Sequence, residues 1–119
     1  MVSQASGRII AISSTTTAVH QEGTSVYSAT KAAVTEMIKI LAKEVAPRGV
    51  TCNIIAPAMM RTESSHGLAE SAEWELEMLK KQTIERIITQ EEVCHVAEFL
   101  ISPLSSGITG QVIYIGLSN

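Results

Sequence analysis

Two apolar segments flank one long helical pattern, and this arrangement limits the folds that the chain can adopt. We predict strands at residues 8–14 and at residues 50–56. Their apolar runs do not alternate with polar residues, which is typical of strands covered on both faces of a parallel sheet. Residues 25–46 between them carry apolar side chains at steps of three and four, which predicts an amphipathic helix. A strand, a helix and a second strand form a βαβ unit with a right-handed crossover.

The ends of the long helix follow from its flanking residues. Residues 15–24 are predicted to be a loop, and Ser25 is expected to cap the helix. Pro47 and Gly49 end it, because proline does not continue a helix and glycine suits the turn that follows.

The rest of the chain adds two helices and a strand. Residues 61–81 are polar and acidic and predict a loosely held helix, either a mobile lid or a solvated surface helix. Thr89 and Glu92 have the spacing of a capping box, so another helix begins there and runs to Pro103. Residues 111–115 form a last strand. The predicted order is β-α-β-α-α-β, an α/β fold.

Length and composition narrow the possible classes. A doubly wound dinucleotide-binding fold needs two βαβαβ halves, and 119 residues suffice for only one. The net charge of −3 gives no reason to expect nucleic acid or an anionic membrane as a partner. No apolar run reaches the roughly 18 residues of a membrane helix, so no membrane is expected. Cys52 and Cys94 lie in apolar segments and predict buried, reduced thiols and a cytoplasmic location. The three histidines are isolated in sequence, so no metal site is expected.

A tyrosine and a lysine four residues apart form the candidate chemical centre. On a helix, Tyr27 and Lys31 lie on the same face, one turn apart. A cation beside a phenol favours the phenolate, which makes tyrosine usable as an acid and base. Ser14 lies thirteen positions before Tyr27, where strand ends gather ligands in α/β sheets. The plainer alternatives are two ordinary surface residues of a helix and a polar loop at residues 13–17.

Taken together and in this order, these features resemble the short-chain dehydrogenase/reductase family. The resemblance rests on Ser14, on Tyr27 with Lys31, and on the segment from Asn53 to Pro57. It covers the whole chain and corresponds to the C-terminal half of a family member, most like the 3-oxoacyl-carrier-protein reductase branch. It implies that residues 1–119 are part of a doubly wound Rossmann-like domain that binds NAD or NADP. The implied reaction is hydride transfer between the nicotinamide and a small carbonyl or alcohol substrate.

The resemblance also implies a role for each matching residue. Ser14 would hydrogen-bond the substrate oxygen, and Tyr27 would exchange its proton. Lys31 would favour the phenolate of Tyr27 and, with it, contact the nicotinamide ribose. The cofactor-binding positions after the second strand are matched by Pro57, Met60 and Thr62. At the position after Pro57 the family has glycine, whereas this chain has alanine.

The sequence also supports a second hypothesis. It contains no glycine-rich turn of the kind that cradles a pyrophosphate, which predicts weak cofactor binding by this chain alone. The chain would then be a gene fragment, the product of an internal start, or one part of a split protein. The alternative function is an inactive remnant or an interaction module. The helix at residues 25–46 would pair with a second copy in a homo-oligomer.

Overall fold

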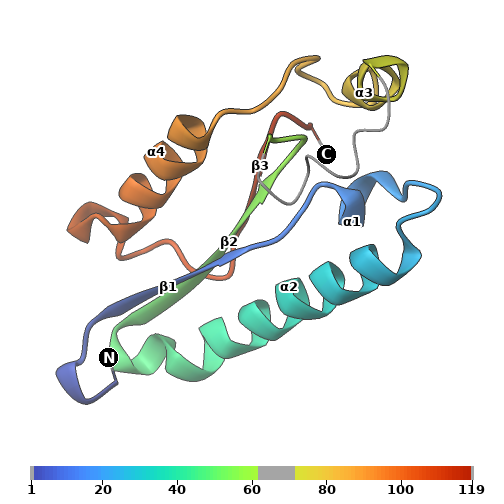
Figure 1. Cartoon of the computed structure of the whole chain (residues 1–119). Coiled ribbons are helices and arrows are strands. Elements are labelled where there is room, and N and C mark those ends of the chain that lie inside the picture. Colours follow the sequence, from blue (N-terminus) through green and yellow to red (C-terminus); the bar gives the residue numbers. More distant parts are fainter. Residues whose placement is uncertain (1, 62–71, 119) are drawn as a thin grey trace.

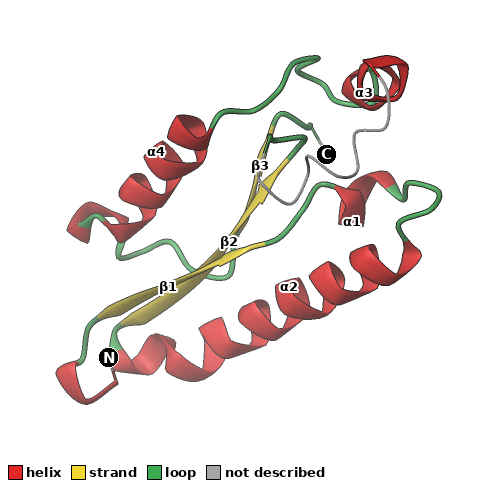
Figure 2. Cartoon of the chain, viewed as in Figure 1, coloured by secondary structure: helices red, strands yellow, loops and turns green. Residues whose placement is uncertain are grey.

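A sheet of three parallel strands lies at the centre of the part of the chain that the structure describes. A computed structural model describes residues 2–61 and 72–118 of the chain. Strands β1 (Gly7–Ile12), β2 (Val50–Pro57) and β3 (Val112–Ile115) lie in the order β1-β2-β3, so β2 is central (Figure 2). The register pairs Gly7 with Val50 on one side of β2, and Ile54 with Val112 on the other.

Helices cover both faces of this sheet. The α-helices of the described residues are α1 (Thr16–Val19), α2 (Ser25–Val45), α3 (Ala72–Leu79) and α4 (Gln90–Ile101), of which α2 and α4 pack on the strands. Figure 1 shows α2 along one face of the sheet and α4 on the opposite face. The predicted α/β class and the order β-α-β-α-α-β are confirmed, with the single turn of α1 added inside the predicted loop at residues 15–24. No helix of the described residues is long and apolar enough to cross a membrane.

The central strand explains why its sequence does not alternate. All eight residues of β2 are buried, because β2 pairs on both edges and is covered on both faces. On the α2 face, Cys52 and Ile54 pack against Ile38 and Ala42 of α2. The prediction that Cys52 is a buried thiol is confirmed, and burial raises the pKa of this thiol.

Strand β1 is less buried than its sequence suggested. It ends at Ile12 rather than at residue 14, and its residues are only partly buried or exposed. In the described residues β1 pairs on one edge only, with β2. Ile12 is consequently 46% exposed although it lies in an apolar run. The hydrophobic pattern of β1 alone predicts a covered strand, whereas the resemblance to one half of a larger domain predicts an exposed sheet edge at residues 8–14, and the strand order of the described residues confirms that edge.

Two other local predictions were wrong. The cap position of α2 is occupied by Thr24, not Ser25, and the Thr24 hydroxyl donates to the Gln21 carbonyl instead of accepting from a helix N–H. Cys94 is exposed on α4 rather than buried. The first error concerns the exact start of a helix, and the second concerns the edge of a buried helix face. Sequence periodicity locates a helix more accurately than either of these features.

Asn53 fastens the loop that leads into β3. Its side chain is almost fully buried on β2. The Asn53 Nδ2 donates to the Ile108 carbonyl at 2.9 Å, and its Oδ1 accepts from the Gln111 N–H at 3.1 Å. The Asn53 side-chain amide therefore bonds one backbone carbonyl and one backbone N–H of the loop that precedes β3.

The predicted capping box at the start of α4 is confirmed. The Thr89 hydroxyl accepts from the Glu92 N–H at 3.2 Å, and Glu92 Oε2 accepts from the Thr89 N–H at 2.8 Å. Arg86 also forms a bidentate ion pair with the Glu92 carboxylate, with N–O distances of 2.9 and 2.6 Å. The Arg86 hydrogen bond, followed by the Thr89 N–H, lowers the pKa of Glu92 from 4.5 to about 2.

This lowered pKa predicts a pH-dependent stability. Because the pKa of Glu92 is lower in the folded than in the unfolded chain, its contacts stabilise the fold above pH 4.5 and are lost as the pH falls towards 2. We expect Glu92→Gln to be less stable than wild type at neutral pH, with the difference shrinking between pH 4.5 and 2. Urea unfolding across this range measures it, with the exposed Glu91→Gln as control. A difference that stays constant down to pH 2 would contradict the assignment.

Candidate active site

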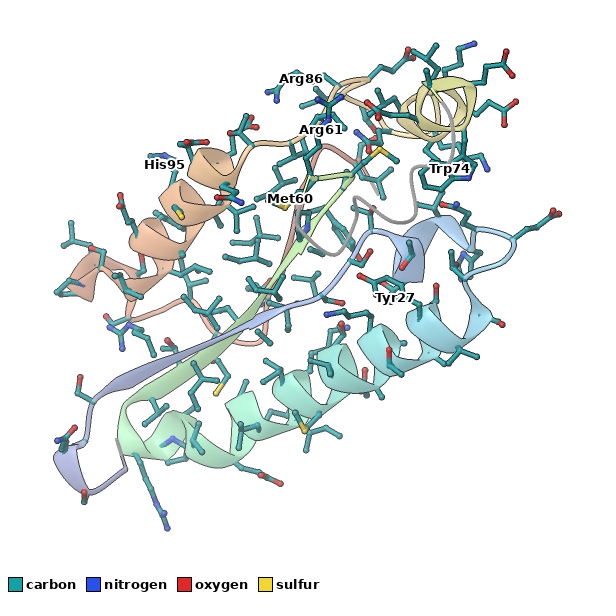
Figure 3. The ribbon with its side chains drawn as sticks, in the orientation of Figure 1. Tyr27, Met60, Arg61, Trp74, Arg86 and His95 are labelled. Atoms are coloured by element: carbon teal, nitrogen blue, oxygen red, sulfur yellow. The ribbon has the colours of Figure 1, made fainter. Side chains whose placement is uncertain are left out.

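The predicted site residues that the structure describes lie near the carboxyl ends of β1 and β2. Figure 3 shows Tyr27 near the start of α2, Met60 just after β2, and Arg61 and Trp74 at the same end of the molecule. In a parallel sheet the carboxyl ends of neighbouring strands share one edge, where ligands of α/β proteins bind. Among the described residues, no group of three or more possible metal ligands is found.

Tyr27 and Lys31 are brought together by the pitch of α2. The Lys31 Nζ lies 5.8 Å from the centre of the Tyr27 ring, within the range of a cation–π contact. The same ammonium donates to the Ile12 carbonyl at the end of β1, at 3.2 Å. Tyr27 itself is 49% exposed. The lysine is therefore held against the strand, and the tyrosine is open to a ligand.

A buried serine and a threonine fasten the turn of α2 that carries Lys31. The Ser13 hydroxyl donates to the Lys31 carbonyl at 3.3 Å, and the Thr35 hydroxyl donates to Ser13 Oγ at 2.8 Å. Ser13 is 4% exposed. Neither residue was assigned a role from the sequence. The signal that could have found them is the serine at the end of the predicted strand together with a threonine four residues after Lys31.

Ser14 begins the turn from β1 into α1. Its side chain is 8% exposed, and its hydroxyl accepts from the N–H and from the hydroxyl of Thr16, at 3.2 and 3.1 Å. Its carbonyl accepts from the Thr17 hydroxyl at 2.9 Å. Within the described residues these side-chain contacts stay inside the turn, and no hydrogen bond joins Ser14 to Tyr27. The structure thus places Ser14 at the predicted end of the sheet and fixes its side chain there.

The segment after β2 is held in place by a distant glutamine. Gln82 Oε1 accepts from the Met59 N–H at 2.7 Å, while its Nε2 donates to the carbonyls of Ile84 and Arg86 at 3.0 and 2.9 Å. The Met59 carbonyl accepts from the Ile88 N–H at 2.9 Å. Nothing in the sequence pattern pointed to Gln82.

The other positions predicted to bind the cofactor have different outcomes. Pro57 is the last residue of β2 and Met60 follows it, as expected. Thr62 lies outside the described residues.

The alanine after Pro57 is compatible with a ligand at this edge. Ala58 is 7% exposed, and a side chain added to Gly116 would meet the Ala58 Cβ at 3.0 Å. The Ala58 methyl therefore packs over Gly116, inside the fold. Gly116 has φ +88°, a conformation that suits glycine. The absence of a Cβ at Gly116 leaves room for the Ala58 methyl.

Helix α3 is joined to both sides of the site. Arg61, which follows β2, forms an ion pair with Glu75 of α3 at 2.9 Å. Gln21, in the loop after α1, donates through its Nε2 to the sulfur of Met78 at 2.7 Å. Of the helix predicted within residues 61–81, the part at Ala72–Leu79 is confirmed, and residues 62–71 lie outside the described residues. This helix contacts the segments that follow β1 and β2.

Comparison with known proteins supports one family. A family model described as enoyl-(acyl carrier protein) reductase matches residues 1–116. The 3-oxoacyl-[acyl-carrier-protein] reductase FabG of Aquifex aeolicus (strain VF5) is 40% identical over 117 residues, which are 97% of this chain and 46% of that protein. The FabG reductase of Chlamydia pneumoniae is 37% identical, with the same shares. The chain thus spans about half the length of the curated relatives it matches.

Solved structures agree with this match. A short-chain type dehydrogenase/reductase from Mycobacterium ulcerans superposes with a TM-score of 0.85 at 32% identity, covering 97% of this chain and 42% of that one. A variant of the actinorhodin polyketide ketoreductase with NADPH has a TM-score of 0.85 at 26% identity, and the match covers 97% of this chain and 48% of the ketoreductase.

Proposed function

Because the chain belongs to the short-chain dehydrogenase/reductase family, we propose that it serves hydride transfer between a nicotinamide cofactor and a carbonyl or alcohol substrate. The observation that carries the proposal is the position of Lys31. Its ammonium lies 5.8 Å from the Tyr27 ring centre and is anchored on the Ile12 carbonyl at the end of β1. A half-exposed phenol beside a fixed cation is a suitable proton donor and acceptor.

The side chains have complementary tasks in this proposal. A bound nicotinamide supplies or accepts the hydride. Hydride addition to a carbonyl carbon places negative charge on the oxygen, and donors that are already in position stabilise that charge. Ser14 donates a hydrogen bond to this oxygen, and Tyr27 donates the proton that converts it to an alcohol. Lys31 places its positive charge beside the ring of Tyr27. In the direction of alcohol oxidation, Tyr27 takes the proton back.

We propose that part of a dinucleotide binds at the same edge of the sheet. Lys31 and the Tyr27 hydroxyl would contact the nicotinamide ribose, and the backbone from Pro57 to Met60, with Thr62, would contact the carboxamide. The methyl of Ala58 packs against Gly116 inside the fold. We propose NADPH as the cofactor, supported by the ketoreductase structure with NADPH.

The names of the relatives suggest the substrate class. Relatives at 40% and 37% identity are 3-oxoacyl-[acyl-carrier-protein] reductases, so we propose a 3-oxoacyl thioester. The chain spans 46% of the length of these relatives. We therefore state it as a further proposal that these 119 residues turn over the substrate by themselves.

Exposed apolar residues on α2 support a second candidate function, an interaction module. Val26, Met37 and Ile40 are 78%, 57% and 52% exposed. Such residues along one helix favour burial against another protein surface. We propose a second copy of the chain as the partner, giving a homo-oligomer through α2. Sedimentation velocity tests this. We expect wild type to sediment as a homo-oligomer and Ile40→Glu to sediment as a smaller species.

Cofactor binding is the first test of the enzymatic proposal. NADPH and NADH are titrated into the purified chain while nicotinamide fluorescence is followed. We expect saturable NADPH binding that Lys31→Ala weakens by about ten-fold, the loss expected for one charged hydrogen bond of about 1.5 kcal/mol.

Lys39→Ala is the matched control, because Lys39 lies two turns further along α2, away from the Ile12 carbonyl. Equal weakening by both substitutions, or no binding by the folded chain, would contradict the proposed role of Lys31. A folded chain that binds no cofactor but self-associates through α2 would instead favour the interaction module.

A further inference from the structure

The hydroxyl of Ser14 has its acceptor capacity filled from within its own turn. A serine hydroxyl has two acceptor lone pairs and one proton to donate. Thr16 supplies two donors to Ser14 Oγ, its backbone N–H at 3.2 Å and its hydroxyl at 3.1 Å. Both lone pairs are therefore occupied, and the remaining capacity of Ser14 is that of a donor.

We propose that Thr16 is a positioning residue that fixes Ser14 as a hydrogen-bond donor towards the ligand at the carboxyl end of β1. A hydroxyl with a free lone pair can rotate and offer either its proton or its oxygen. With both lone pairs engaged, the proton points away from Thr16. A developing oxyanion needs a donor that is already aligned, because realignment during the reaction costs free energy.

The surroundings of Ser14 support this assignment. Its side chain is 8% exposed, so little water competes for the two bonds from Thr16. The Thr17 hydroxyl donates to the Ser14 carbonyl at 2.9 Å, so this bond leaves the two lone pairs of Ser14 Oγ to Thr16. Any residue at position 16 except proline provides the N–H, but only a hydroxyl side chain such as threonine or serine provides this second donor. The role in turnover rests on the proposed function, whereas the orientation of the hydroxyl does not.

The orientation is tested without any turnover. Neutron diffraction from crystals of the deuterated chain locates the deuteron on Ser14 Oγ. We expect it to point away from Thr16 in wild type and in Thr16→Ser, and to lose this single orientation in Thr16→Val. A deuteron shared from Ser14 to Thr16 Oγ1 in wild type would overturn the inference. So would an unchanged single orientation in Thr16→Val.

Kinetics test the consequence for the reaction. In the reduction of a 3-oxoacyl thioester by NADPH, we expect Ser14→Ala to lower kcat about 10²-fold. Thr16→Val should lower kcat about ten-fold with KM unchanged, less than Ser14→Ala because the Thr16 N–H remains as a donor. Thr16→Ser should restore the wild-type value.

Thr17→Val serves as the matched control, because it removes a hydroxyl bound to the Ser14 carbonyl and leaves both bonds to Ser14 Oγ. Equal losses in Thr16→Ser and Thr16→Val, or a loss in Thr17→Val as large as in Thr16→Val, would overturn the positioning role. Absence of turnover in wild type would count against the proposed function alone, and the neutron result would still decide the orientation.

Discussion

Tyr27→Phe is expected to lower the rate of NADPH-dependent reduction of a 3-oxoacyl thioester by about 10²- to 10⁴-fold, the usual contribution of general acid catalysis. The substitution removes only the phenolic oxygen. The ring that lies 5.8 Å from Lys31 Nζ remains, and the Tyr27 carbonyl still accepts from the Thr30 hydroxyl. Loss of rate can then be assigned to the missing proton donor. The decrease of NADPH absorbance at saturating substrate measures kcat.

Tyr114→Phe is the matched control for this experiment. Tyr114 lies on β3 and is partly buried, and it is the other tyrosine of the chain. Its variant should keep a kcat close to that of wild type. A Tyr27→Phe variant that retains a rate within a few-fold of wild type would contradict the acid role. Because the Tyr27 hydroxyl is also proposed to contact the nicotinamide ribose, NADPH binding by the variant is titrated in parallel, and kcat is compared at saturating NADPH.

Gly49→Ala is expected to have the largest effect on stability. Gly49 ends the turn after α2 with φ +72°, and a Cβ there would collide with the backbone carbonyl of Ala5. The left-handed conformation costs an alanine about 1 kcal/mol, and forced displacement of packed backbone adds about 1–3 kcal/mol. We expect a loss of roughly 3 kcal/mol in the free energy of unfolding, measured by urea denaturation followed by circular dichroism.

Two other glycines separate the contributions of strain and collision. Gly23 has φ +80° but open space around a Cβ, so Gly23→Ala should cost about 1 kcal/mol from strain alone. Gly107 has open space and no positive φ, so Gly107→Ala should change stability by less than about 1 kcal/mol. If Gly49→Ala is no more destabilising than Gly23→Ala, the contact with Ala5 is not a constraint on the fold.

The parts of the structure that the sequence predicted depend on local patterns. The buried run of β2, the helical period of α2 and the capping box of Thr89 and Glu92 each express a rule that acts within a few residues. The proximity of Tyr27 and Lys31 is equally local, because one helix carries both. These features were predicted correctly for that reason.

The parts that the sequence did not predict depend on contacts between distant segments. The 46% exposure of Ile12 follows from the position of β1 at one end of the strand order, which hydrophobicity along one strand does not report. The hydrogen bond between Gln82 and the Met59 N–H spans 23 positions of the chain. The hydrogen bond between the hydroxyls of Thr35 and Ser13 joins α2 to the end of β1. Polar side chains of this kind resemble ordinary surface residues until the fold brings them together.

The partner of Lys31 is a backbone atom, and this affects how the site tolerates change during evolution. The ammonium is bound to the carbonyl of Ile12, which every amino acid at position 12 would provide. Ile12 can therefore be replaced by another amino acid without removing this contact, provided that the new residue still forms the strand. The hydroxyls of Ser13 and Thr35 have no such backbone substitute. Selection that preserves the lysine's position should therefore act on residues 13 and 35 and leave residue 12 free to vary among strand-forming residues.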